Sequence, residues 1–286
     1  MSDAEQSTQQ LKRKVLQLEE ENAELRRQME QVEKERIEYL QNVSHQLVAP
    51  LNAIKWHIEN LTAPEGRIGL DRAKKVLRSI YSQATLVVHL AKNFNLMSNL
   101  EADHALSKLK EPLQEISLRQ LLVNLADDFQ PLAWDSNINI IVDQDHFDDG
   151  PAILAMRPLV SQVFSNIIEN AVKYSKNDTK VMIQGKYLSE RDCFMVSISN
   201  EGIPLNPEHN EKIFARGFRS EEATRKYPAG TGFGLYIARR IVDIHEGEIT
   251  ASTRNGWTVF EVILSVKGLK GKARTRVKKN YTTNRR

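Results

Sequence analysis

The chain has 286 residues, 41% of them hydrophobic and 27% charged, with a formal net charge of +3, which suits about two globular domains with polar surfaces. No apolar run approaches the roughly 20 residues needed to cross a bilayer, and residues 1–10 lack the basic and apolar regions of a signal peptide. A single cysteine, Cys193, excludes an internal disulfide and a cysteine metal cluster, so we expect a cytoplasmic protein without a transmembrane segment.

The first predicted element is a signalling helix over residues 1–36 that forms a coiled coil. From Leu11 to Val32, apolar residues recur at alternating spacings of four and three, with Asn22 at one of the core positions. This pattern favours a parallel dimer, in which a buried Asn22 sets the register, over a lone amphipathic helix. The repeat breaks at Arg36, and a change of phase there is a plausible switch point for a signal.

A helical hairpin is predicted over residues 37–105. The apolar repeat resumes in a shifted phase at Ile37 and runs to Leu61, where the turn-forming residues 62–66 should end the helix. A second helix carries an apolar stripe from Ala73 to Phe94. Two such hairpins bury both stripes in a four-helix bundle, so we expect a homodimer.

The remainder, residues 112–266, mixes strands and helices without strict alternation, which predicts an α/β sandwich with helices on one face of a mixed sheet. The 200–230 segment reads as one long loop, and a structureless loop of this length inside a compact domain usually acts as a lid. Helices are expected at 118–133, 156–174 and 233–245, and strands at 138–142, 180–187, 193–199, 248–253 and 257–265.

Two local patterns in this region have the chemistry of a phosphate site. Glycines at every second position open the last helix, where backbone amides and the helix N-terminus can approach phosphate oxygens; a flexible loop is the alternative. On the 156–174 helix, Asn166, Asn170 and Lys173 share one face and could hold hydrated Mg²⁺ and a triphosphate, although a solvated polar face has the same pattern.

Together with the 200–219 segment, and in this order, these patterns resemble the N, G1, F and G2 boxes of the histidine-kinase ATP-binding domain, which has the Bergerat or GHKL fold. The resemblance covers about residues 112–266 and implies ATP and Mg²⁺ as cofactors. It implies that Asn170 ligates the metal, that Tyr174 lies against adenine, and that Arg216 or Arg219 approaches the phosphates. The other nucleotide-binding residues that it implies are Asn166, Lys173, Asn200, Gly202, Gly230, Thr231, Gly232, Gly234 and Leu235.

The chain departs from this family twice in the G1 box. Asn200 stands where the family has an aspartate that accepts from the adenine amino group; an amide oxygen can also accept, but without charge assistance. Pro204 replaces the second glycine of the box and should stiffen the start of the lid. We therefore expect nucleotide binding that is weaker than is usual for the family.

The segment around His45 resembles the H box of the HisKA dimerisation and phosphotransfer domain. His45 lies roughly 200° around the helix from Val43 and Leu47, so it faces away from the apolar seam, and a neutral imidazole nitrogen can attack phosphorus. Gln46 replaces the acidic residue thought to activate the imidazole, and glutamine cannot accept a proton. Ala49 replaces a polar residue that helps to place water. The other six histidines, His89 among them, are interpreted as structural or surface residues.

These resemblances predict a sensor histidine kinase that phosphorylates its own His45, with Gln46 and Lys173 at the reacting groups, and passes the phosphoryl group to an aspartate of a response regulator. The departures imply slow autophosphorylation and weak phosphatase activity. The chief alternative is a pseudokinase scaffold that binds ATP and a response regulator without chemistry. A gyrase-type ATPase fits less well, because Asn166 stands where those enzymes have a water-activating glutamate.

Two further expectations concern the source of the signal and the basic C-terminal segment. No sensor domain is recognisable, so an upstream partner should supply the signal, unless the chain is a shortened one. Residues 267–286 contain nine Lys or Arg and no acidic residue, whereas the preceding residues carry a net charge of −6. This segment is predicted to be a disordered tail, and a solvated role is favoured over contact with nucleic acid or an acidic membrane.

Overall fold

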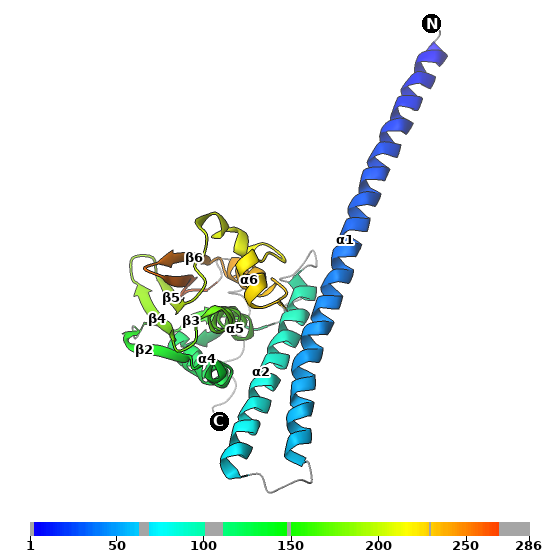
Figure 1. Ribbon diagram of the computed structural model, residues 1–286. Coiled ribbons are helices and arrows are strands. Elements are labelled where there is room, and N and C mark those ends of the chain that lie inside the picture. The colour runs from blue at the N-terminus through cyan, green and yellow to red at the C-terminus, as the bar shows by residue number, and fades with distance from the viewer. Residues whose placement is uncertain (1–2, 63–68, 101–110, 148–149, 229, 269–286) are drawn as a thin grey trace, which may run out of the picture. The chain divides into compact units, whose positions relative to one another are not determined.

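The computed structural model describes residues 3–62, 69–100, 111–147, 150–228 and 230–268 (Figure 1). Two compact units make up the chain, residues 1–45 and 46–286, and helix α1 (Asp3–Thr62) belongs to both. No described helix has the length and apolarity to cross a membrane. Most of the predicted tail, residues 269–286, lies outside the described residues, as does most of the predicted hairpin turn, residues 63–68.

Helix α1 joins the predicted signalling helix and the first predicted hairpin helix without interruption. The repeat break at Arg36 therefore changes the face on which apolar side chains lie and leaves the backbone helical. The helix also continues through Pro50. The seam residues Val15, Leu25 and Met29 are all more than half exposed in the single chain. The coiled-coil dimer remains a prediction.

Helix α2 (Leu70–Leu100) has a buried face that its apolar periodicity did not predict. Its buried side chains are Ser82, Leu86, His89 and Met97, and this face packs against three helices of the α/β region, α4 (Leu118–Ala133), α5 (Arg157–Tyr174) and α7 (Gly234–Ile244). The expected stripe, by contrast, includes Leu77 at 57% exposed. Two of the four buried side chains are polar, and for this reason hydrophobic spacing did not identify the face.

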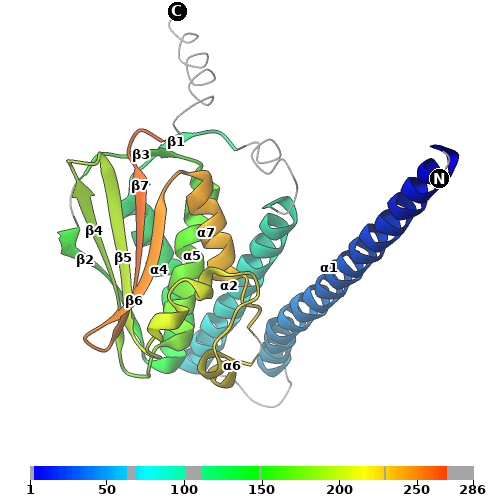
Figure 2. The same cartoon turned by 90° about the horizontal axis from the view of Figure 1, so that it is seen from above.

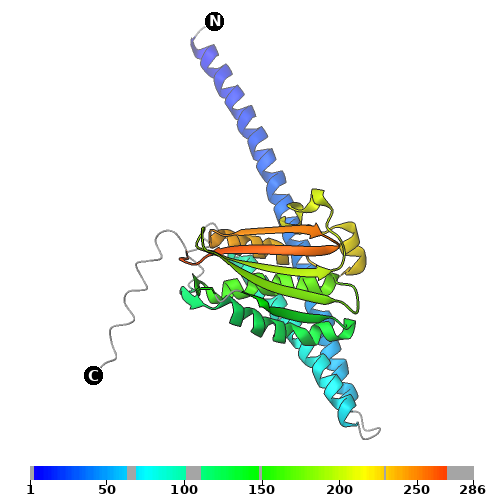
Figure 3. The same cartoon turned by 90° about the vertical axis from the view of Figure 1, so that its left-hand side faces the viewer.

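The sheet has the order β2-β4-β5-β7-β6 (Figure 2). Its first pair, β2 and β4, is parallel, and the other three pairs are antiparallel. The predicted mixed sheet with helices on one face is confirmed, since α4, α5 and α7 all cover the same side (Figures 2 and 3). The strands are β2 (Asn139–Phe147), β4 (Lys180–Leu188), β5 (Cys193–Glu201), β6 (Glu248–Arg254) and β7 (Trp257–Ser265).

Alternation of side chains explains why one face of this sheet is covered. In β5 the residues Phe194, Val196 and Ile198 are buried and those between them are not, and β7 repeats the pattern in register beside it. A strand with one apolar face must pack that face against another layer. The amphipathic helices α5 and α7 supply that layer with the fully buried Ile167 and Ile237 among their side chains.

Short elements account for the differences from the predicted pattern. Strands β1 (Gln114–Ile116) and β3 (Ile153–Ala155) form a separate antiparallel ladder that the sequence did not indicate. The predicted structureless loop 200–230 was wrong in part: β5 extends to Glu201, and two 3-10 turns, Pro207–His209 and Lys212–Phe214, precede helix α6 (Glu221–Lys226). These elements are too short to produce a detectable period.

Candidate nucleotide site

The predicted polar face of α5 exists, but its first residue is bound by the hairpin. Asn166 is 1% exposed, and its Oδ1 accepts a hydrogen bond from Asn93 Nδ2 of α2 at 2.8 Å. His89 Nε2, also of α2, lies 2.8 Å from the same oxygen. Gln162 donates to Asn93 Oδ1 at 2.9 Å and so completes the group. Because Oδ1 faces donors from α2, the Asn166 amide is oriented with its Nδ2 as a buried donor that has no partner.

A buried charged group lies beside Asn166. Glu169 is 5% exposed, forms an ion pair with Lys173, and has His89 Nε2 3.0 Å from its other oxygen. Burial alone would raise the pKa of Glu169, but the Lys173 ammonium and His89 outweigh burial and lower that pKa. Burial alone would lower the pKa of Lys173, and Glu169 reverses the effect, so the lysine pKa is raised. Glu169 and Lys173 are therefore both charged near neutral pH.

His89 is the functional residue that sequence reasoning missed. It was interpreted as a structural or surface histidine, and it is indeed buried, but it contacts Asn166 of α5 directly. Burial lowers the pKa of His89, and Lys173 and Lys92 act in the same direction, against the opposing effect of Glu169. The imidazole is therefore neutral at pH 7, with its proton on Nε2 between two acceptor oxygens. The sequence offered no clear signal, because His89 shares its helix face with both polar and apolar residues, Ser82, Leu86 and Met97.

The pH dependence of stability should report His89. Since its folded-state pKa lies below 6.5, the unfolded chain binds more protons, and stability should fall as the pH drops below about 6.5, by up to about 1.4 kcal/mol per pH unit. His245 is also buried, with a pKa lowered by burial, and acts in the same window. Between pH 7.5 and 5, the free energy of unfolding in urea should depend less steeply on pH in His89→Gln than in wild type. His245→Gln should remove a separate part of that pH dependence. Equal slopes for wild type and His89→Gln would contradict the assignment.

One cavity of about 390 Å³ collects most of the predicted nucleotide residues. Eleven of the thirteen line it, and Gln46 of α1 lines it too; Gly202 and Arg216 do not. Residues that were not predicted, among them Glu169, Leu90 and Asn93, complete the wall beside α5. The predicted residues at the cavity are Gln46, Asn166, Asn170, Lys173, Tyr174, Asn200, Arg219, Gly230, Thr231, Gly232, Gly234 and Leu235.

The two ends of the cavity differ in chemistry. At one end lie Asn170, Lys173 and the N-terminus of α7, which together offer an amide oxygen, an ammonium group and free backbone amides. Another part of the wall is apolar, with Ile203, Leu205, Ile213, Phe260 and the ring of Tyr174, and Asn200 and Thr258 are buried at the sheet beside it; the lid adds the polar side chains of Asn206, His209, Ser220 and Glu222. An arrangement of this kind suits a ligand with an anionic end and a flat apolar end.

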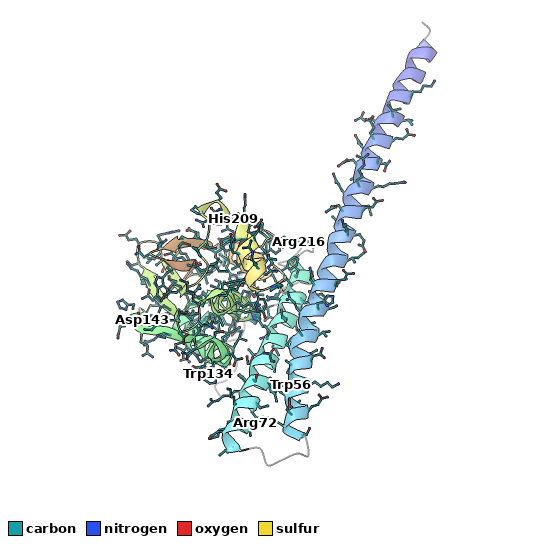
Figure 4. All side chains as sticks on the ribbon, in the orientation of Figure 1. Trp56, Arg72, Trp134, Asp143, His209 and Arg216 are labelled. Atoms are coloured by element: carbon teal, nitrogen blue, oxygen red, sulfur yellow. The ribbon has the colours of Figure 1, made fainter. Side chains whose placement is uncertain are left out.

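The two arginines expected near the phosphates differ in position, since Arg219 lines the cavity and Arg216 does not. The Arg219 guanidinium donates to the carbonyls of Pro228 and Gly230 at 3.0 Å, and to those of Ala223 and Tyr227, so it holds the lid segment (residues 203–228 and 230–233) together. Arg216 is exposed, outside the cavity wall, with its guanidinium 5.9 Å from the Phe233 ring centroid (Figure 4). Carbonyls left unpaired at this turn compete for arginine donors.

At Gly232 both the backbone conformation and the close packing of the lid require a residue without a side chain. Its φ is +71°, and an added Cβ would lie 2.7 Å from the carbonyl carbon of Gly217. Gly232→Ala should therefore destabilise the lid and weaken ADP binding at least tenfold, measured by titration calorimetry, because positive φ and a backbone clash act together. Gly256→Ala is the matched control: its φ is +80° but nothing lies within 4 Å of the added Cβ. Equal ADP binding by both variants would contradict the role assigned to the close approach.

His45 lies on α1 with an exposed side chain, as the sequence predicted, and Ala49 is exposed as well. The described residues contain no group of three or more His, Cys, Asp or Glu that could hold a metal ion. A divalent ion here would therefore depend on ligand phosphates together with the amide oxygen of Asn170. This donor set fits Mg²⁺, which takes oxygen ligands and is bound by few protein groups when phosphates are present.

Comparison with known proteins identifies the class. Residues 156–268 match the sequence profile of the family described as histidine kinase-, DNA gyrase B-, and HSP90-like ATPase. Among curated proteins, the chain is 28% identical over 219 residues to histidine protein kinase SaeS of Staphylococcus epidermidis, covering 76% of this chain and 60% of that protein. It is 27% identical over 229 residues to sensor histidine kinase WalK of Bacillus subtilis, covering 77% and 35%.

The chain is thus similar to sensor histidine kinases, and the resemblance predicted for the ATP-binding region is confirmed. It spans about 60% of the length of SaeS. A crystal structure titled ShkA full-length in complex with AMPPNP superimposes with a TM-score of 0.53 and 20% identity, over 82% of this chain and 47% of that one. At this identity the superposition shows a shared fold.

Proposed function

We propose that this chain is an ATP-dependent protein histidine kinase that phosphorylates His45 and passes the phosphoryl group to an aspartate of a response regulator. The observation that carries the proposal is the single cavity in which Asn170, Lys173, Tyr174 and the glycines that precede α7 come together. The cavity lies largely in the region that matches the ATPase family, and relatives matched over three-quarters of the chain are named histidine kinases.

In this proposal the phosphates of ATP occupy the polar end of the cavity. The amide oxygen of Asn170 would ligate Mg²⁺, which neutralises phosphate charge when bound. The unpartnered Nδ2 of Asn166, oriented by His89 and Asn93, would donate to a phosphate oxygen. Lys173 is held by Glu169 and would contribute positive charge at the same place. Phosphoryl transfer needs mainly positioning and charge neutralisation, which these groups provide.

The reaction on His45 is a displacement at phosphorus. A neutral imidazole nitrogen forms a bond to the γ-phosphorus, the bond from that phosphorus to the bridging oxygen of ADP breaks, and ADP leaves with the electron pair. Gln46 can orient the ring through its carbonyl oxygen but cannot take the imidazole proton, which passes to solvent. Transfer then moves the phosphoryl group from nitrogen to an aspartate carboxylate of the response regulator.

The domain assignment belongs to the same proposal. Residues 1–36 would form a coiled coil, 37–105 a dimerisation and phosphotransfer hairpin, and 112–266 the ATP-binding domain. The exposed apolar side chains Leu40, Leu51 and Ile58 of α1 and Leu77 of α2 support a homodimer, because a second copy would cover them. The single Cys193 suits the cytoplasm, and an upstream partner would supply the signal.

The decisive experiment is incubation of the purified chain with γ-labelled ATP and Mg²⁺, followed by mapping of the labelled residue. We expect acid-labile phosphate on His45 and none in His45→Ala. Nucleotide binding without any label on the wild type would favour the pseudokinase scaffold, which Gln46 motivates. Steady ATP hydrolysis that His45→Ala leaves unchanged would instead favour a gyrase-type ATPase.

Weak phosphatase activity is a separate prediction. Ala49, one helical turn after His45, has no polar group to place a water molecule against the phosphorylated partner. The purified chain should therefore change the lifetime of a phosphorylated response regulator less than twofold, as measured by gel separation of the two forms. Ala49→Thr restores a hydroxyl and should shorten that lifetime; rapid dephosphorylation by the wild type would contradict the prediction.

A further inference from the structure

Asn200 lines the cavity, and its buried side-chain nitrogen Nδ2 has no hydrogen-bond partner in the described structure. The residue lies near the end of β5 and is 2% exposed. Buried polar side-chain atoms in folded proteins nearly always have a partner. Since Asn200 lines the cavity, we take the missing partner to be a group of the ligand.

Near Asn200, the neighbouring hydroxyl of Thr258 has no proton left to donate to a ligand. Thr258 faces Asn200 across the β5–β7 pair, but the Thr258 hydroxyl donates to the carbonyl of Ile203 at 2.9 Å and its proton is therefore already used. At Gly202 an added Cβ would lie 2.6 Å from Asn200 Nδ2, so the absence of a side chain there leaves space for the amide.

The position of Asn200 places it at the edge of a base and away from the phosphates. Its neighbours on the cavity wall are Thr258, opposite it on β7, and Ile203, whose carbonyl accepts from Thr258, whereas the N-terminus of α7 lies against Asn166, about two turns before Tyr174 on α5. A flat purine ring against the apolar side chains of Ile203 and Phe260 and the ring of Tyr174 would turn its hydrogen-bonding edge to Asn200 and Thr258, which are buried polar side chains of the cavity wall.

A carboxamide can match two kinds of purine edge. Adenine presents an amino group at position 6, which donates, and guanine presents a carbonyl oxygen there, which accepts. The Asn200 oxygen can accept from the first, and after a half-turn of the amide the Nδ2 group can donate to the second. A carboxylate at this position could only accept, so it would leave a 6-oxo group facing a negative charge.

We propose that Asn200 lets this pocket bind 6-oxopurine nucleotides, those of inosine and guanosine, about as well as adenine nucleotides. The inference rests on the proposed nucleotide-binding function and adds to it the basis of its selectivity. A site that can satisfy both edges discriminates little between them, whereas a site whose buried polar group is left unpaired by one ligand rejects that ligand strongly.

The test compares ADP with inosine diphosphate, each with Mg²⁺, by titration calorimetry on the full chain. Inosine carries the 6-oxo group without the 2-amino group of guanine, so the comparison isolates position 6. Wild type should bind the two nucleotides within about threefold of each other. Asn200→Asp should weaken inosine diphosphate relative to ADP by about tenfold or more, the effect expected for a buried group left unpaired.

Asn177→Asp, which makes the same change of charge on an exposed turn, is the matched control and should leave the ratio of the two affinities unchanged. A wild type that prefers ADP by tenfold or more overturns the inference and leaves the proposed function intact. An Asn200→Asp ratio equal to that of wild type also overturns it. If wild type binds neither nucleotide, the proposed function fails as well. Because wild type alone gives the first comparison, a variant that does not fold leaves the inference testable.

Discussion

Asn170→Ala is expected to reduce labelling of His45 from γ-labelled ATP by about a hundredfold or more. Asn170 lines the cavity near the C-terminal end of α5, with its side chain partly exposed, and offers an oxygen ligand beside Lys173. A correctly placed metal contributes several kcal/mol to stabilising transferred phosphoryl charge, and each 1.36 kcal/mol changes a rate about tenfold. The loss should be smaller when Mn²⁺, which binds nitrogen and oxygen ligands more strongly, replaces Mg²⁺.

The fold should survive this substitution, because alanine favours helix and the Asn170 side chain makes no hydrogen bond to the described protein. Asn177→Ala on the exposed turn after α5 is the control and should label at the wild-type rate. The measurement is the initial rate of His45 labelling, compared between variants whose thermal unfolding temperatures equal that of wild type. Full labelling by Asn170→Ala would show that this amide does not hold the metal.

Lys173→Met should destabilise the folded chain by about 3 kcal/mol in urea unfolding at pH 7. The substitution leaves the Glu169 carboxylate buried beside His89 and without the ammonium group that forms its ion pair. Removing one partner of a buried pair costs about 3–5 kcal/mol, since the remaining charge is neither hydrated nor neutralised. Methionine keeps most of the length of the lysine side chain, so loss of packing contributes little to the difference.

Glu169→Gln combined with Lys173→Met should be less destabilised than Lys173→Met alone, because the unpaired charge is then absent. Arg225→Ala, which breaks the exposed pair with Glu221 on α6, is the control and should leave stability unchanged within error. A Lys173→Met variant as stable as wild type would mean that the pair is solvated in solution. The same variant should also bind ADP less tightly.

Helix α6 and helix α2 show where inference from the sequence ended. Helix α4 begins and ends where the sequence predicted, at 118 and 133, because its apolar spacing is regular and Ser117 accepts from the Gln120 amide as an N-cap. Helix α6 has six residues and no buried side chain, so it offered no periodic signal inside the predicted loop. The polar buried face of α2 was invisible for a related reason, since periodicity reports apolar spacing only.

In the candidate site, some residues were predictable from local sequence patterns and others were not. Asn166, Asn170, Lys173 and the glycines before α7 are local patterns, and the sequence by itself determined that these residue types could surround a phosphate. The partners of Asn166, which are His89 and Asn93, stand 77 and 73 residues away along the chain, and only the packing of α2 on α5 brings them to its oxygen. Local spacing determines which face of an element is apolar or polar, but which two faces meet depends on the free energy of packing the whole chain. The sequence therefore determined the kind of site, and the tertiary structure decided which buried groups orient it.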